Sequence, residues 1–324
     1  MITRGTIPAH LEQNVRVNFL KTQKSYAPLR KPFVGETQSS GAYELYGDMG
    51  AVPWPILNGG QMGSGGTDER TGAPAAGTIS AGENVKIVGG EERAVMVRNV
   101  SWDIGIGITQ YAIDDGRTAE LEDWARGAGS RFEQHKDYLA FNALNTGAAT
   151  TFLPACYDGQ ALFSAAHADP GAEYTTAQSN ALATALSYTN FKAARVAGSK
   201  YRDSRGVPAG LTHNLLIYPS DLIDEAAQII SNPEKAGTGN RDKNPFAGKT
   251  RGIEAPGGWL DTTAWFLVDD STPQKPLYIQ NRMAPTLYMD YDPKAADGGV
   301  WYFIWRARYT IFPGDWRLVI QGDA

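Results

Sequence analysis

Three patterns in the 324-residue sequence predict an α+β fold. Apolar side chains recur every three or four residues between positions 118 and 146, which is typical of a long amphipathic helix. Apolar and polar residues alternate between Glu92 and Ile113, and again in the aromatic-rich run that begins at Val300, which is typical of strands with one buried face. Shorter helical and strand patterns lie between them. The chain therefore mixes both kinds of element.

Composition narrows the class of protein. Hydrophobic residues make up 42% of the chain, enough for a buried core in one large or two ordinary domains. A formal charge of −5 gives no whole-chain attraction to nucleic acid. Cys156 is the only cysteine, so an intrachain disulfide is excluded. No apolar run approaches the roughly 20 residues of a membrane helix, and the N-terminus lacks the apolar region of a secretory signal, so we expect a soluble protein.

The first ninety residues predict little regular structure. Residues 11–19 fit a short helix that Pro28 and Pro32 end, which indicates an N-terminal arm. Residues 57–90 are rich in glycine and poor in large apolar side chains, so they cannot form a core of their own. They fit either a disordered linker or a loop that something outside the subunit orders. Within them, residues 78–88 could supply one strand of a hairpin.

The long helix has a defined start and end. Thr118 fits the N-cap position, acidic residues occupy the first turn, and Gly147 follows the last turn. Gly127 and Gly129 each cost up to about 1 kcal/mol relative to alanine, so this helix needs tertiary support. Its apolar stripe consists of Leu121, Trp124, Ala128, Phe132, His135 and Leu139.

The second half of the chain predicts further elements. Residues 187–196 fit a helix, residues 215–218 fit a buried strand, and Ser220 fits the cap of a helix that Asn232-Pro233 ends. Residues 259–269 and 276–282 fit a pair of strands. The aromatic run from Val300 to Gly322 fits a long strand pair.

No residue is predicted to be catalytic, cofactor-binding or metal-binding. Cys156 and His167 could form a thiol nucleophile and its base, but a lone cysteine is more often a small buried hydrophobe. Gly248-Lys249-Thr250 lacks the earlier glycine and the strand of a phosphate-binding loop, so a solvated loop is expected. The aspartate pairs at 114–115 and 269–270 are expected to be solvated, since no further carboxylate follows at ligand spacing. The four histidines are scattered without zinc-ligand spacing: His10, His135, His167 and His213.

Two sets of side chains fit interfaces as well as ordinary surface or core. The basic set fits a solvated face or a subunit contact equally. It consists of Lys192, Arg195, Lys200, Arg202 and Arg205. The tryptophan set fits core or interface anchors. It consists of Trp54, Trp102, Trp259 and Trp301.

Several short segments, in order, resemble the Mu-type major head subunit family of tailed bacteriophages. They are SSGAYELYGDMGAVPWP from Ser39, CYDGQALFSAAH from Cys156, LSYTNFKAAR from Leu186, GVPAGLTHNLLIYPSD from Gly206, WLDTTAWFLVDD from Trp259 and PLYIQNR from Pro276. The resemblance implies the tailed-phage major capsid fold, of the Hong Kong 97-like kind. The implied parts are an N-terminal arm (1–40), the start of the peripheral domain (41–56), an extended β-hairpin loop (57–92), the peripheral domain (93–185) with its spine helix (118–146), an axial domain (186–284) and C-terminal strands returning to the peripheral domain (285–324).

The resemblance also implies a function. Such subunits form hexamers and pentamers that close into an icosahedral shell around double-stranded DNA, without enzymatic activity. A scaffolding protein, a maturation protease and a portal are expected as separate proteins, and a decoration protein could be a further partner. The packaged DNA is expected to be contacted without sequence specificity. The shell is expected to assemble in the host cytoplasm. The alternatives are the shell of a cellular nanocompartment and, from another class, a hydrolase that uses Cys156.

Overall fold

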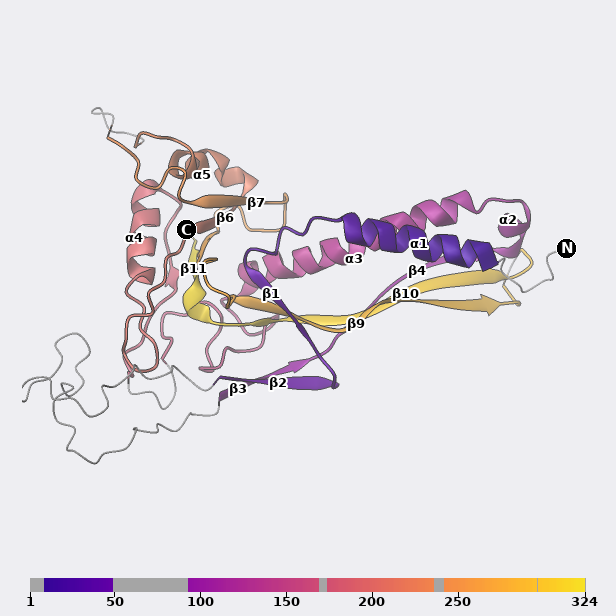
Figure 1. Ribbon diagram of the computed structural model, residues 1–324, viewed down its shortest axis with the longest axis horizontal. Coiled ribbons are helices and arrows are strands. Elements are labelled where there is room, and N and C mark those ends of the chain that lie inside the picture. The colour runs from indigo at the N-terminus through magenta and orange to yellow at the C-terminus, as the bar shows by residue number, and fades with distance from the viewer. Residues whose placement is uncertain (1–8, 49–92, 169–173, 236–241, 296, 324) are drawn as a thin grey trace, which may run out of the picture.

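Two sheets of different shape lie at opposite ends of an elongated molecule (Figure 1). The computed structural model describes residues 9–48, 93–168, 174–235, 242–295 and 297–323. A long sheet carries two parallel helices, and a more compact sheet at the other end carries two shorter ones (Figure 1). The predicted α+β class is confirmed. The helices are α1 (Ala9–Ser25), α2 (Gln110–Asp114), α3 (Ala119–Thr146), α4 (Tyr188–Gly198) and α5 (Ile223–Ile230).

The long sheet has the strand order β1-β9-β10-β4. Its strands are β1 (Val34–Gln38), β4 (Ser101–Thr109), β9 (Leu277–Asp292) and β10 (Val300–Pro313). β10 pairs antiparallel with both β9 and β4, whereas β1 runs parallel to β9. Alternation along β10 buries Phe303 and Trp305 on one face and leaves Tyr302 and Arg306 exposed on the other. The predicted alternation is therefore confirmed over β10.

The predicted long helix, α3, lies against this sheet. It begins after Thr118 and ends at Gly147, as expected, although the Thr118 side chain makes no capping hydrogen bond. Trp124 on α3 packs against Trp305 on β10, with 5.2 Å between ring centroids. The predicted stripe is confirmed: Leu121, Ala128, Phe132 and Leu139 are buried, and Trp124 and His135 are half-buried.

The helix predicted over residues 11–19 is longer and lies along α3. Asn14 of α1 donates a hydrogen bond to Glu122, near the start of both helices, at 3.0 Å. Gly129 marks the closest approach, because a Cβ atom there would lie 2.3 Å from the Phe19 carbonyl oxygen. At Gly127 a Cβ atom would meet nothing within 4 Å. Only Gly129 is therefore explained by packing.

The chain leaving α1 is fixed by Asp137, a fully buried carboxylate on α3. It accepts hydrogen bonds of 2.9 Å from the Tyr26 hydroxyl and from the Arg30 guanidinium. Arg30 is 2% exposed and forms further ion pairs of 2.8 Å with Glu133 and Glu36. These contacts join the N-terminal segment to the middle of α3.

Burial and hydrogen bonding shift the pKa values of this cluster. Burial alone would raise the pKa of Glu133, but Lys136 and Arg30 hold it below its ordinary value of 4.5. Burial and the bond to Asp137 raise the pKa of Tyr26 to about 12. The carboxylate form of Glu133 therefore stabilises the fold.

The second sheet has the order β5-β11-β8-β6-β7. Its strands are β5 (Ala181–Leu182), β6 (Leu215–Pro219), β7 (Arg251–Ala255), β8 (Trp265–Val268) and β11 (Val319–Gly322). The predicted strand at 215–218 and the helix that follows Ser187 are confirmed, and the Ser187 hydroxyl caps α4 by accepting from the Asn190 N–H at 3.1 Å. α5 ends at Ile230, ahead of Asn232-Pro233 as predicted.

The prediction that residues 259–269 pair with residues 276–282 is wrong. β8 pairs with β6 and β11, whereas β9 pairs with β1 and β10 in the other sheet. Directly after β8, the buried Asp269 accepts hydrogen bonds from the N–H groups of Thr212 (2.6 Å) and Ser271 (2.9 Å). This turn directs the chain from one sheet to the other.

The predicted strand pair at the C-terminus is also wrong. After β10 the chain forms a short 3₁₀ helix, η2 (Trp316–Leu318), and β11 then joins the second sheet beside β8. The chain passes close to Lys275 where it changes direction, and only glycine fits at position 314. A Cβ atom there would lie 2.2 Å from the Lys275 carbonyl oxygen.

Two local predictions fail because side chains find other partners. The strand expected up to Ile113 ends at Thr109, whose hydroxyl accepts from the Ala112 N–H at 3.2 Å and starts α2. Ser220 does not cap a helix: it lies in a 3₁₀ turn, η1 (Ser220–Leu222), and its hydroxyl donates to Glu254 at 2.6 Å.

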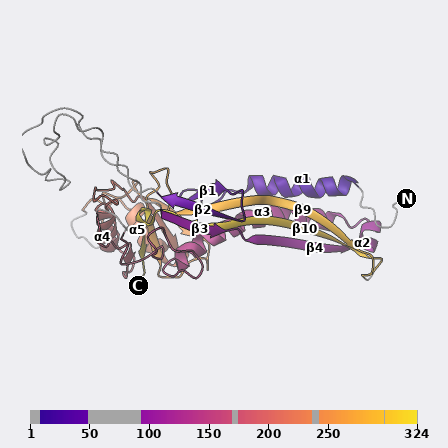
Figure 2. The same cartoon turned by 90° about the horizontal axis from the view of Figure 1, so that it is seen from below.

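A third sheet consists of two antiparallel strands, β2 (Tyr43–Asp48) and β3 (Arg93–Arg98). We call it the β2–β3 ribbon. It lies beside the place where β1 meets the long sheet (Figures 1 and 2). The extended loop predicted over residues 57–92 lies outside the described residues.

Substituting alanine for each of the two glycines in α3 should change the stability of the protein in opposite directions. Gly129→Ala should destabilise the protein, because the new methyl group meets the α1 backbone, which cannot shift as a flexible side chain can. Gly127→Ala is the matched control and should raise the free energy of unfolding by up to about 1 kcal/mol through helix propensity. Urea unfolding of both variants measures the difference, and equal effects would contradict the packing of α1 on α3.

Removing the buried carboxylate of Asp137 should lower the stability of the folded protein. Asp137→Ala should lower the free energy of unfolding by about 3–5 kcal/mol, because the buried Arg30 guanidinium loses one of its three carboxylate partners and the Tyr26 hydroxyl loses its acceptor. The control is Asp123→Ala, an exposed acid on the same helix, which should change stability by less than about 1 kcal/mol.

Stability should also fall in acid. The folded pKa of Glu133 is depressed, so its contribution is present above the unfolded pKa and is lost as the pH falls through the folded value. Urea unfolding at a series of pH values below 4.5 should show this loss, and Glu133→Gln should reduce the pH dependence. An unchanged pH profile in that variant would contradict the assignment.

Candidate functional site

The two residues of the hydrolase hypothesis are buried structural groups. Burial, and then the carboxylates of Asp158 and Asp315, raise the pKa of the Cys156 thiol, the opposite of what an activated nucleophile needs. The His167 ring lies 2.6 Å from Asp158 through Nδ1 and 3.2 Å from Asn180 Oδ1 through Nε2. Both ring nitrogens therefore have partners other than the thiol.

Asn180 is the centre of this buried cluster, and no pattern in the sequence predicted its role. Its side-chain N–H₂ donates to the carbonyl oxygens of Leu162 (2.8 Å), Trp316 (3.1 Å) and Val319 (3.2 Å). The segment that begins at Cys156 is thereby bonded to the C-terminal strand. A single asparagine in a loop carries no local pattern that would predict such distant partners.

The other candidate chemical sites are absent or differ from expectation. Gly248 has a φ of 71° in an exposed turn between α5 and β7, as expected of a solvated loop and not of a phosphate-binding loop. Asp114 and Asp115 are exposed as predicted, but Asp269 is fully buried, and Asp270 pairs with Arg251. Within the described residues, no three His, Cys, Asp or Glu side chains are grouped to hold a metal.

The basic set divides into two kinds of residue. Arg195 lies over the Phe246 ring, 5.4 Å from its centroid, and Arg202 lies over Tyr174 at 5.8 Å. Lys192 and Lys200 are exposed. Two of the five residues thus hold loops of their own subunit, a role that neither prediction included.

Three of the four singled-out tryptophans are half-buried anchors, and Trp54 lies outside the described residues. Trp102 donates to the Tyr309 carbonyl at 2.9 Å, and Trp301 donates to Gln110 at the same distance. Trp259 packs against Phe141. The fully buried tryptophans are different ones: Trp265, Trp305 and Trp316.

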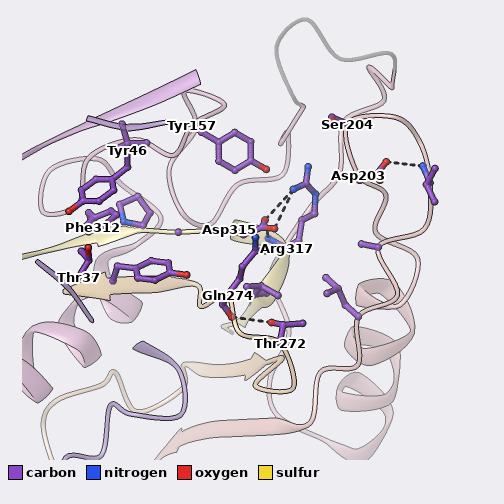
Figure 3. Close-up of a pocket in the computed structure, with 18 of the residues that line it drawn as sticks. Thr37, Tyr46, Tyr157, Asp203, Ser204, Thr272, Gln274, Phe312, Asp315 and Arg317 are labelled. Carbon is purple, nitrogen blue, oxygen red and sulfur yellow. Dashed lines mark hydrogen bonds and ion pairs between the residues drawn. The ribbon is translucent and has the colours of Figure 1, made fainter. Parts of the chain in front are cut away.

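A cavity of about 600 Å³ lies where the β2–β3 ribbon meets the loops of the second sheet (Figure 3). Tyr46 and Phe312 stack on one side of it, with 4.4 Å between ring centroids. On the other side Arg317 pairs with Asp315 at 3.3 Å, and Asp203 accepts backbone N–H groups. These charged groups are engaged within the chain, which favours a junction between sheets over a catalytic centre.

The β2–β3 ribbon presents the most exposed apolar face among the described residues. Its inner face packs Tyr46, Val95 and Val97 against Phe312. Its outer face carries Tyr43, Leu45 and Met96, which are 56%, 62% and 53% exposed, and Leu45 lies opposite Met96 across the two strands.

The base of the ribbon is held firmly. Glu44 accepts hydrogen bonds of 2.7 Å from the N–H groups of Ser40 and Gly41, and these bonds, the Gly41 bond first, lower its pKa. Asn99 donates to Ser39 at 2.9 Å and accepts from Gln280 of β9 at 2.7 Å. The outer apolar face is therefore fixed in orientation relative to the long sheet, which suits a contact surface.

A family of known proteins matches most of this chain. The family model described as phage capsid protein matches residues 93–321, more than half of the chain. No curated protein matches the sequence. No described helix meets the length and hydropathy needed to cross a bilayer.

Solved capsids share the fold at low sequence identity. The bacteriophage JBD30 capsid subunit is 16% identical, with a TM-score of 0.52 over 79% of this chain and 100% of that one. The capsid subunit of cyanophage P-SCSP1u is 8% identical, with a TM-score of 0.53 over 100% of this chain and 92% of that one. That of Ralstonia phage GP4 is 14% identical, with a TM-score of 0.51 over 90% and 86%. This chain therefore belongs to the phage capsid protein family and is a shell-forming protein with the tailed-phage, Hong Kong 97-like fold.

Proposed function

We propose that this protein is the Mu-type major head subunit of a tailed bacteriophage, assembling as hexamers and pentamers into an icosahedral shell around double-stranded DNA. The observation that carries the proposal is the anchored outer face of the β2–β3 ribbon, with Leu45 and Met96 more than half exposed. Covering a large apolar side chain contributes about 1.5–3 kcal/mol, and a shell repeats that gain at every subunit.

The domain organisation implied by the resemblance belongs to the same proposal. The arm, extended loop, peripheral domain and axial domain keep the boundaries stated above, with α3 as the spine helix. The protein has no enzymatic role, which the raised pKa of the buried Cys156 thiol supports.

Partners are proposed by the same reasoning. Scaffolding protein, maturation protease and portal are separate proteins, and the shell forms in the host cytoplasm. One similar capsid, that of bacteriophage JBD30, is decorated with minor capsid protein trimers, which supports a decoration protein here. DNA is contacted without sequence specificity.

The direct test is sedimentation and electron microscopy of the protein purified without denaturant. Closed shells, or rings with five-fold and six-fold symmetry, support the proposal, and nuclease-protected DNA inside particles from infected cells separates a phage head from a nanocompartment. A monomer or dimer that stays small at high concentration, with and without a scaffolding protein, would overturn it.

The ribbon face should be required for assembly. Leu45→Ser combined with Met96→Ser should reduce shell yield strongly while leaving the thermal unfolding of the subunit unchanged, because both side chains are exposed in the single chain. Leu45→Met is the matched control, since it keeps an apolar side chain, and should assemble normally. Normal shells from the double variant, seen by sedimentation, would show that this face is not an interface.

A further inference from the structure

The outward face of α1 carries a second apolar seam, which stays exposed among the residues that the structure describes. The inward face, formed by Leu11, Val15 and Phe19, is buried against α3 and the long sheet. On the opposite side Val17 is 41% exposed and Leu20 is 46% exposed. Figure 2 shows α1 at the margin of the molecule, with α3, β9 and β10 all on one side of it.

The spacing of this seam is that of a coiled coil. Gln13, Val17, Leu20 and Lys24 are four, three and four residues apart, so they form one stripe down the helix. In a heptad they occupy alternating d and a positions, with the apolar pair in the centre. A second helix could pack its own apolar seam here without displacing α1 from α3.

The charges beside the seam select the partner. Arg16 and Lys21 occupy the flanking g and e positions, and Lys24 lies in the seam itself. Among the described residues, Arg16 of α1 forms an ion pair with Glu12 at 2.9 Å. Lys21 and Lys24 take no part in this pair and are exposed. Residues at e and g set partner choice by charge, so a partner with Glu or Asp there is favoured.

We propose that this face of α1 docks an acidic amphipathic helix of a separate polypeptide, with apolar residues at a and d and acidic residues at e and g. DNA is the weaker fit, because Val17 and Leu20 lie at the centre of the face and phosphates gain nothing from apolar contact. The proposal rests on the exposed seam and not on the geometry of the shell.

The test uses the full chain and a labelled peptide of about four heptads with Leu at a and d and Glu at e and g. At neutral pH its glutamates oppose self-association, so it is free to meet a basic helix. Fluorescence anisotropy at low salt should show saturable binding that weakens at least about tenfold in Leu20→Glu and in Lys21→Glu combined with Lys24→Glu. Lys31→Glu, an exposed lysine beyond the helix, is the matched control and should bind like the unmodified protein.

Two further measurements separate the outcomes. A peptide with Lys at e and g should fail to bind the unmodified protein and should bind the variant carrying both glutamates. Binding of a DNA duplex in place of the acidic peptide, or peptide binding that none of the seam substitutions weakens, would overturn the proposal. Thermal unfolding and sedimentation of the same variants show whether folding and shell formation are intact, so that failure here is distinct from failure of the proposed function.

Discussion

The buried carboxylate of Asp137 is the contact on which the half of the molecule built on the long sheet depends. A fully buried charge is tolerated only when partners replace its lost water, and here the Tyr26 hydroxyl and Arg30 supply them. Because those partners follow α1 in the chain, satisfying the charge also fixes where α1 lies. Close packing at Gly129 then sets the distance between α1 and α3. One electrostatic constraint thus positions a helix, and with it the seam that faces outward.

The long sheet and the second sheet share a hydrophobic core, and specific contacts fix how the chain passes between them. Asn180 bonds one loop to the C-terminal strand, and Gly314 lets the chain pass closely enough to change sheets. The β2–β3 ribbon packs its inner face on Phe312 at the same junction and leaves Leu45 and Met96 outward. A subunit built in this way buries what it needs for its own stability and keeps apolar surface for its neighbours. That division of surface suits a protein whose work is assembly.

Local periodicity predicted much of the fold. The helix from Thr118 to Gly147, the strand at 215–218, the helix after Ser187 and the alternation of β10 were all recognised, because each depends on side chains three, four or two residues apart. The pairing of strands was harder to predict from the sequence. β8 and β9 were both predicted as strands, but they lie in different sheets. The turn between them depends on a hydrogen bond from Thr212 to Asp269, 57 residues apart, which no local pattern indicates.

The sequence by itself determined the class of fold, the likeness to a phage capsid protein and the exclusion of an intrachain disulfide. Only the tertiary structure decided which apolar residues are covered. Val15 and Val17 have the same side chain two residues apart in one helix, yet Val15 is fully buried and Val17 is 41% exposed. The physical reason is that a side chain is buried only when a second surface packs against it. For α1 that surface is provided by α3 and the long sheet, which come from distant parts of the chain.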